Sequence, residues 1–269
     1  MLVKRALGRI RNFPLMLIRG CCILLARINP RIATVLEVEL QRVQGKGFDG
    51  GIGYEVEMAC DLLVEMGLTD IVALDVGANI GDYSAAFLRV SPRAKIFAFE
   101  PSSYALKALG ERFKGNDSVT LVPFALSSSN SIETLWSNVA GSGLASLSKR
   151  RLNHLDTGFN ESERVEVITL DSWVDNTKIL PSFIKIDVEG HELDVLKGGS
   201  KTLSKTHLVQ FEFGGANIDS RTFFRDLWYL LTEIGFDIYR VSPNGLIHVS
   251  RYSESVECFA FSNFFARKK

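Results

Sequence analysis

The segment that most constrains the fold is an apolar run that ends abruptly in small residues. Residues 71–76 read Ile-Val-Ala-Leu-Asp-Val, and residues 77–81 read Gly-Ala-Asn-Ile-Gly. A nearly continuous apolar strand is typical of a parallel sheet that is covered on both faces. Glycines directly after the strand let the backbone turn tightly and approach a bound molecule. The segment therefore predicts an α/β fold with a ligand-binding turn at the carboxyl end of this strand.

A helix and a second strand follow at the spacing of nucleotide-binding folds. Residues 83–90 carry apolar side chains at helical intervals, so the free amides at the start of this helix would face the turn. The apolar residues 95–99 then end in Glu100, 19 residues beyond Gly81. Nucleotide-binding folds place an acid at this position to bind ribose hydroxyls.

The turn differs from the G-x-G-x-x-G pattern of dinucleotide-binding proteins, because Asp75 stands two residues before Gly77. A carboxylate at this position disfavours a pyrophosphate and suits a ligand with a cationic or amino-acid part. S-adenosylmethionine meets this requirement, since it has a sulfonium, an α-amino group and a ribose for Glu100. A nicotinamide-dependent oxidoreductase is the alternative enzyme, and a turn that binds nothing is the alternative without function.

A second group of polar residues follows the predicted strand at residues 183–187. Lys185, Asp187 and Glu189 would share one face of this strand under the two-residue alternation of β-structure. An unpaired ammonium inside a sheet costs several kcal/mol, so Lys185 needs a carboxylate partner, either Asp187 or Glu212. The alternative is that its long side chain reaches the surface.

Three blocks of this sequence, at residues 75–81, 99–101 and 184–192, resemble the FkbM family of S-adenosylmethionine-dependent methyltransferases. The blocks occur in the family's order, and Lys-Ile-Asp-Val-Glu-Gly in the third is the most specific. The resemblance covers roughly residues 54–262. It implies a doubly wound, Rossmann-like methyltransferase sheet that is mostly parallel, with an antiparallel pair of strands at one edge.

The resemblance and the strand ends together select the candidate site residues. Those assigned to the cofactor are Asp75, Gly77, Ala78, Asn79, Gly81, Glu100, Pro101, Ser102 and Ala125. Those left for the methyl acceptor and for catalysis are Lys185, Asp187, Glu189, His191 and Glu212.

A hydroxyl is a poor nucleophile until a base takes its proton, and His191 or a carboxylate is a suitable base. A divalent metal held by Asp187 and neighbouring carboxylates would be another way to activate the hydroxyl, although no motif supports it. His191 also has a simpler interpretation, as a solvated residue in the first turn of a helix. The sequence does not choose between these options.

The implied activity is methyl transfer from S-adenosylmethionine to a hydroxyl, on a sugar of a glycan or of a glycosylated natural product. The oxidoreductase is disfavoured by Asp75 and by the missing glycine triplet. A scaffold protein without turnover is disfavoured because the cofactor motif and the block at residues 187–192 are both present.

The remaining pattern predicts further elements. We expect a helix at residues 56–66 ended by Gly67, and one at 223–234 ended by Gly235. Residues 141–148 form either a loop that closes over substrate or a mobile surface loop. The other predicted elements are strands at 119–125, 132–136, 165–170 and 207–213, helices from 170 and across 193–203, and closing strands at 236–241 and 257–262 joined through residues 243–245.

The length of 269 residues suits one large α/β domain, which we place at residues 54–269 after an extension and glycine-rich hinge at residues 1–53. The formal net charge is zero, which offers no electrostatic argument for nucleic acid as a partner. The four cysteines have neither zinc-site spacing nor the density of a disulfide framework, so a reducing, cytoplasmic compartment is expected.

Residues 1–36 hold basic side chains, no acid and a strongly apolar stretch. Arg19 and Arg27 interrupt this stretch, so it is too short to span a membrane as a helix, and it lacks the pattern of a secretory signal. It would either lie on the anionic cytoplasmic face of a membrane or pack on the catalytic domain, and we favour packing.

Overall fold

The computed structural model describes residue 17, residues 20–25 and residues 27–269. More than half of the predicted basic segment at residues 1–36 therefore lies outside the described residues. The chain divides into two units, residues 1–44 and 45–269. In the smaller unit, α2 (Pro30–Val43) begins after Asn29, whose side chain accepts a hydrogen bond from the backbone amide of Arg31. No residue of α2 is buried.

The larger unit is built on an eight-stranded sheet with the order β10-β9-β11-β8-β7-β1-β2-β3. Neighbours from β8 to β3 pair in parallel, while β11, β9 and β10 are antiparallel, which confirms the predicted sheet. The strands are β1 (Val72–Val76), β2 (Lys95–Phe99), β3 (Val119–Val122), β7 (Phe183–Ile186), β8 (Leu208–Phe213), β9 (Phe236–Ser242), β10 (Gly245–His248) and β11 (Ser262–Lys268).

The strand order reverses beside β1. The chain proceeds outward from β1 to β2 and β3, and then returns to place β7 on the other side of β1. The helices that follow β1 and β7 therefore lie on opposite faces of the sheet, which leaves a crevice at the carboxyl ends of the two strands. This is the place where open α/β sheets bind ligands.

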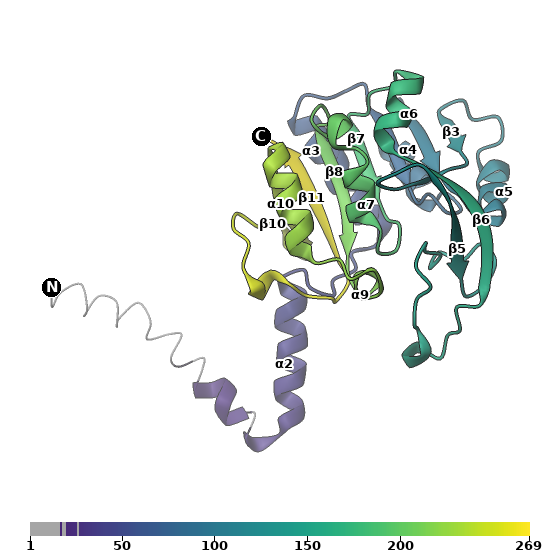
Figure 1. The fold of residues 1–269 in the computed structure, drawn as a ribbon. Helices are drawn as coiled ribbons and strands as arrows, with labels where there is room; N and C mark the ends of the chain where they lie inside the picture. Colours follow the sequence, from purple (N-terminus) through teal and green to yellow (C-terminus); the bar gives the residue numbers. More distant parts are fainter. Residues whose placement is uncertain (1–16, 18–19, 26) are drawn as a thin grey trace. The chain divides into compact units, whose positions relative to one another are not determined.

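Helices cover both faces of the sheet, and the central strands are buried on both sides. In β1, Leu74 and Val76 pack in the core on one face, whereas Ala73 packs in the core on the other. Figure 1 shows α7 and α10 on the first face and α3 and α4 on the opposite face. The helices of this unit are α3 (Gly51–Glu65), α4 (Asp82–Val90), α5 (Ser103–Arg112), α6 (Leu170–Thr177), α7 (Glu192–Lys197), α8 (Ser200–Leu203), α9 (Ala216–Ser220) and α10 (Phe224–Ile234).

A small second sheet corrects the predicted strand at residues 119–125. That segment divides at Pro123, which has no N–H to continue the ladder, so β3 ends at Val122. Ala125 instead begins β4 (Ala125–Leu126), where it pairs with Val167. The second sheet has the order β4-β6-β5, with β5 at Ser131–Ser137 and β6 at Glu161–Ile168.

Two further predictions are wrong. Residues 257–261 are not a strand, because the Glu257 carboxylate accepts hydrogen bonds from the first amides of α10, and β11 begins only at Ser262. The turn at residues 243–245 joins β9 to β10 instead.

The helix predicted across 193–203 is divided into α7 and α8 near Gly198, where a Cβ atom would lie 2.0 Å from the Ser127 carbonyl oxygen.

The glycine-rich segment after α2 belongs to the larger unit. The amide of Gly47 donates to the Phe261 carbonyl at 2.7 Å, and the Ser262 hydroxyl donates to the Gly45 carbonyl at 3.1 Å. The division between the units thus falls after Gln44, whereas the sequence places it after residue 53. Among the described residues, no helix combines the length and the hydropathy that crossing a membrane requires.

Gly77 ends β1 in a conformation and at a spacing that only glycine allows. Its φ is +84°, and a Cβ atom would lie 1.8 Å from the carbonyl oxygen of Asp187. Gly67 has a similar φ of +75°, but a Cβ atom there would meet nothing within 4 Å. Substitutions at Gly77 and at Gly67 therefore separate the effect of backbone strain on stability from the effect of a steric clash.

We predict that Gly77→Ala lowers the free energy of unfolding by at least about 2 kcal/mol more than Gly67→Ala does, because both substitutions strain the backbone but only the first also moves the turn after β7. Urea denaturation of both variants measures the difference. Equal losses would show that the two turns are not packed together as described.

Candidate active site

Two adjoining cavities lie at the carboxyl end of the parallel sheet. Glu100, Phe124 and the loop at residues 142–147 line the first, which we call the Glu100 cavity. Glu55, Lys185 and Glu212 line the second, which we call the Glu55 cavity. Both are lined by Gly77, Asn79, Gly143 and Asp187, so the cavities meet at the turns after β1 and β7.

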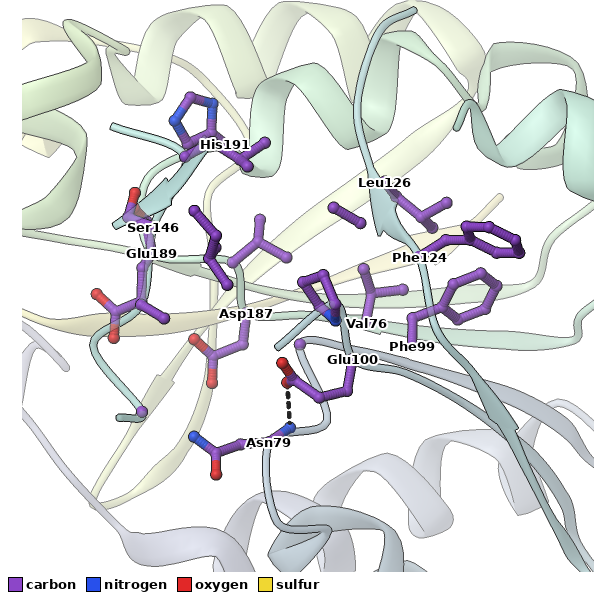
Figure 2. A pocket seen from close by; sticks show the side chains of 18 of the residues that line it. Val76, Asn79, Phe99, Glu100, Phe124, Leu126, Ser146, Asp187, Glu189 and His191 are labelled. Carbon is purple, nitrogen blue, oxygen red and sulfur yellow. Dashed lines mark hydrogen bonds between the residues drawn. The ribbon is translucent and has the colours of Figure 1, made fainter. Parts of the chain in front are cut away.

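Glu100 connects the turn after β1 with the turn after β2. Its Oε2 accepts a hydrogen bond from the backbone amide of Asn79, and its Oε1 accepts one from the amide of Ser102, each at 2.8 Å. Figure 2 shows the carboxylate above Asn79, with the bond between them marked. Burial raises the pKa of Glu100 to about 7, although the two amides favour the ionised form.

The predicted cofactor residues divide into three groups. Gly77, Asn79, Glu100, Pro101 and Ala125 line the Glu100 cavity. Ala78 lines the Glu55 cavity. The other three residues line neither cavity. Gly81 is the N-cap of α4 with a φ of +84°, the backbone amide of Ser102 donates to Glu100, and Asp75 is buried in β1.

Asp75 and Lys185 form a buried ion pair. They are direct neighbours in the register of β1 and β7, and Lys185 Nζ lies 3.5 Å from Asp75 Oδ1 and 3.1 Å from Asp187 Oδ2. Ser84 also donates to Asp75 at 2.6 Å. Burial alone would lower the pKa of Lys185, but Asp187 and Asp75 together raise it.

The predicted partner Asp187 is thus confirmed, and Asp75 takes the place proposed for Glu212. The side chain of Lys185 is only 9% exposed, so it does not reach the surface.

The turn after β7 corrects the predicted alternation of Lys185, Asp187 and Glu189. The strand ends at Ile186, and Glu189 has a φ of +53°, so its side chain does not continue the face of Lys185. The carboxyl of Glu192 closes this turn by accepting hydrogen bonds from the amides of Val188 and Gly190.

Arg150 holds Glu189 in place, with Nη1 donating to Oε2 at 2.5 Å, and its Nε lies 3.5 Å from Asp219. Burial first, and Asp187 second, raise the pKa of Glu189 to about 7 despite this arginine. A residue in a strained conformation and with a perturbed pKa is typical of a functional site.

His191 lines the Glu100 cavity and contacts the loop at residues 141–148. Its Nε2 lies 2.9 Å from Ser148 Oγ and its Nδ1 lies 3.0 Å from Asp194 Oδ2, so both ring nitrogens have partners. Ser146 Oγ donates to the Glu189 carbonyl at 2.8 Å. The loop is therefore held against the turn after β7, and Figure 2 shows Ser146 beside Glu189 and His191.

Glu55 is a cavity residue that the sequence did not single out. It lines the second cavity from α3, and its carboxylate accepts hydrogen bonds from Gln210 and Asn263. The available signal was a carboxylate on the apolar face of a helix, directly before Val56 and four residues before Ala59. Among the described residues, no group of three or more histidine, cysteine, aspartate or glutamate side chains is arranged to hold a metal ion.

The strand order, the turn at residues 75–81 and the acid after β2 define a Rossmann-like methyltransferase of the kind that uses S-adenosylmethionine. Residues 75–238 match the model of the methyltransferase FkbM domain. Since this match covers more than half of the chain, the protein belongs to the FkbM methyltransferase family. The predicted family, fold and methyl donor are confirmed at this level.

Two curated relatives are similar over much of their length. The 2-O-methyltransferase NoeI of Sinorhizobium fredii is 32% identical over 154 residues, which cover 54% of this chain and 63% of NoeI. The hexuronic acid methyltransferase AglP of Haloferax volcanii is 32% identical over 175 residues, which cover 64% of this chain and 66% of AglP. The matched segments thus span slightly less than two thirds of each relative.

Among solved structures, the methyltransferase FkbM of Methylobacillus flagellatus matches with a TM-score of 0.47 and 19% identity, covering 74% of this chain and 44% of that protein.

We predict that Lys185→Met lowers the free energy of unfolding by about 3–5 kcal/mol, because it leaves the buried carboxylate of Asp75 without a cation. Urea denaturation at neutral pH measures this loss. Adding Asp75→Asn to the same chain should recover a large part of it, since the uncompensated charge is then removed. A single variant as stable as the unchanged protein would contradict the buried pair.

Proposed function

We propose that the protein transfers the methyl group of S-adenosylmethionine to a hydroxyl on a sugar, within a glycan or a glycosylated natural product. The observation that carries this proposal is the meeting of two cavities at Asn79 and Asp187, one lined by Glu100 after β2 and the other rich in carboxyl groups. The names of the two relatives, a 2-O-methyltransferase and a hexuronic acid methyltransferase, support a sugar acceptor.

The Glu100 cavity suits the methyl donor. Glu100 would accept hydrogen bonds from the ribose hydroxyls, since each carboxylate oxygen has a lone pair beyond the one used by a backbone amide. Phe124 and Leu126 offer an apolar wall for the adenine. When bound, the donor supplies an electrophilic methyl group on a sulfonium.

Asp187 is the best-placed residue to act on the acceptor. Its side chain is 37% exposed, and it lies at the junction of both cavities. Lys185 holds one of its oxygens, which leaves the other to orient the acceptor hydroxyl and to take its proton. We assign this role to Asp187 rather than to His191, because both ring nitrogens of the histidine are engaged elsewhere.

We predict that Glu100→Gln weakens binding of S-adenosylhomocysteine at least tenfold, because charge-assisted hydrogen bonds to the ribose are lost. In the unchanged protein, affinity should rise with pH and level off above pH 7, since hydroxyl donors favour ionised Glu100, whose pKa is raised to about 7. The variant should lose this pH dependence.

Calorimetric titration between pH 5.5 and 8.5 measures both effects, with Glu111→Gln as the control, because Glu111 is an exposed acid on α5. A titration with NAD in the same instrument tests the oxidoreductase, and binding of neither molecule would favour the scaffold protein. Unchanged affinity in a folded Glu100→Gln variant would refute the ribose assignment.

We predict that Asp187→Asn reduces turnover by about a hundredfold or more while S-adenosylhomocysteine still binds, because removing a general base typically costs 10²–10⁴ in rate. Release of S-adenosylhomocysteine in the presence of sugar acceptors measures the rate. His191→Gln is the comparison variant and should keep most of the activity. The opposite ranking would assign the proton transfer to the histidine.

We also propose peripheral contact between residues 1–36 and the cytoplasmic face of a membrane that carries a lipid-linked glycan. Each basic residue close to an anionic surface contributes about 1 kcal/mol, a gain that salt screens. Leu17, Leu24 and Leu25 are exposed among the described residues and would add apolar attachment. The competing hypothesis, which the sequence pattern by itself favours, is that this segment packs on the catalytic domain.

We predict that the full-length protein cosediments with anionic vesicles at low salt, is released by high salt and does not bind neutral vesicles. A chain that starts at residue 37 should stay in the supernatant and still bind S-adenosylhomocysteine. If the full-length protein does not bind the vesicles while the shortened chain aggregates, the segment packs on the catalytic domain instead.

A further inference from the structure

Glu55 is fixed in the second cavity by a chain of hydrogen bonds. Its side chain projects from α3, and the residue is 8% exposed. Asn263 Nδ2 donates to its Oε1 at 2.6 Å, and Gln210 Nε2 donates to its Oε2 at 2.7 Å. The Tyr83 hydroxyl in turn donates to Gln210 Oε1 at 2.5 Å, which orients that amide. Each oxygen of Glu55 therefore keeps a lone pair for a further donor.

The Glu55 cavity is lined by more carboxyl groups than basic groups. Its carboxyl groups belong to Asp49, Glu55, Asp82, Asp187 and Glu212. Among the residues that line it, all of them in the described part of the chain, Lys185 alone is basic. This lysine is already 3.1 Å from Asp187 and 3.5 Å from Asp75, so its charge is balanced by those two partners. Asp82 is paired with Arg112 at 2.6 Å, outside the cavity lining.

This charge pattern discriminates between classes of sugar. Hydroxyl and ammonium groups are hydrogen-bond donors that carboxylates bind well. The carboxylate of a uronic acid, a phosphate or a sulfate would meet like charges and would find no unpaired cation among the lining residues. Like-charge contacts in a partly desolvated site exclude a ligand more strongly than the loss of one favourable contact does.

On the basis of the proposed sugar methyltransferase function, we propose that Glu55 binds the acceptor and makes the cavity select uncharged or amino sugars against uronates. This preference differs from the hexuronic acid in the name of AglP. Glu55 and Asn263 lie outside residues 75–238, so the feature belongs to parts of this chain that the family model does not cover.

Burial raises the pKa of Glu55 to about 7, and Lys185 and Gln210 counteract this rise. A donor from the acceptor would favour the ionised form further, because it stabilises the charge. Glu212 contributes less charge to this selection, because burial and the nearby acids raise the pKa of this second cavity carboxyl and favour its neutral form.

The test uses the full-length protein with three series of methyl glycosides. Each series contains the gluco, galacto and manno forms, as neutral hexosides, as 2-amino-2-deoxyhexosides and as hexuronides. Initial rates are measured as release of S-adenosylhomocysteine. The variant is Glu55→Gln, and the matched control is Glu57→Gln, which removes an equal charge from an exposed position of the same helix.

The unchanged protein should methylate neutral or amino sugars at least tenfold faster than the matching hexuronides. In Glu55→Gln, the KM for the best neutral or amino sugar should rise about tenfold, and the ratio of hexuronide to neutral kcat/KM should rise at least tenfold. The control should keep both values, and affinity for S-adenosylhomocysteine should stay within twofold in all three proteins, because Glu55 does not line the Glu100 cavity.

A preference of the unchanged protein for hexuronides would overturn this inference while supporting the sugar methyltransferase. If the ratio of hexuronide to neutral kcat/KM is equal in Glu55→Gln and Glu57→Gln, Glu55 does not select the acceptor. Methylation of no sugar by a protein that still binds S-adenosylhomocysteine would overturn the proposed function, and the inference with it.

Discussion

The buried group formed by Lys185, Asp75 and Asp187 determines how the site is assembled. It joins the two central strands, β1 and β7, at the level where the chain leaves the sheet to form the two turns that line both cavities. Two carboxylates in the same space would repel each other without the ammonium between them, and the ammonium would be too costly to bury alone. The charged residues therefore stabilise one another only when both strands are in register.

A second set of contacts encloses the crevice. Arg150 binds Glu189, Ser146 binds the backbone of Glu189, and Ser148 lies against His191. These contacts bring the loop before β6 over the turn after β7, so that one polar segment forms a wall of both cavities. The two turns and the loop thereby form two adjoining spaces, which is the arrangement that the proposed in-line transfer from a donor to an acceptor requires.

The fold was largely predictable, because its signals are local. The apolar run before Gly77, the helical spacing in α10 and the glycines after two helices each indicate one element without knowledge of the rest. Predictions failed where a distant contact overrides the local pattern. Residues 257–261 resemble a strand, but they bind the start of α10 through Glu257, and residues 119–125 divide between two sheets at Pro123.

The sequence by itself determined the class of protein, since the turn after β1, the acid after β2 and the block at residues 184–192 each stand in short continuous segments. It also showed that a buried Lys185 needs a carboxylate, because this follows from the cost of burying charge. Only the tertiary structure decided that Asp75 is one of the partners, that His191 holds a loop, and that Glu55 lines the second cavity. These roles depend on strand order and on contacts between residues far apart in the chain, such as Glu55 and Asn263, which no local pattern records.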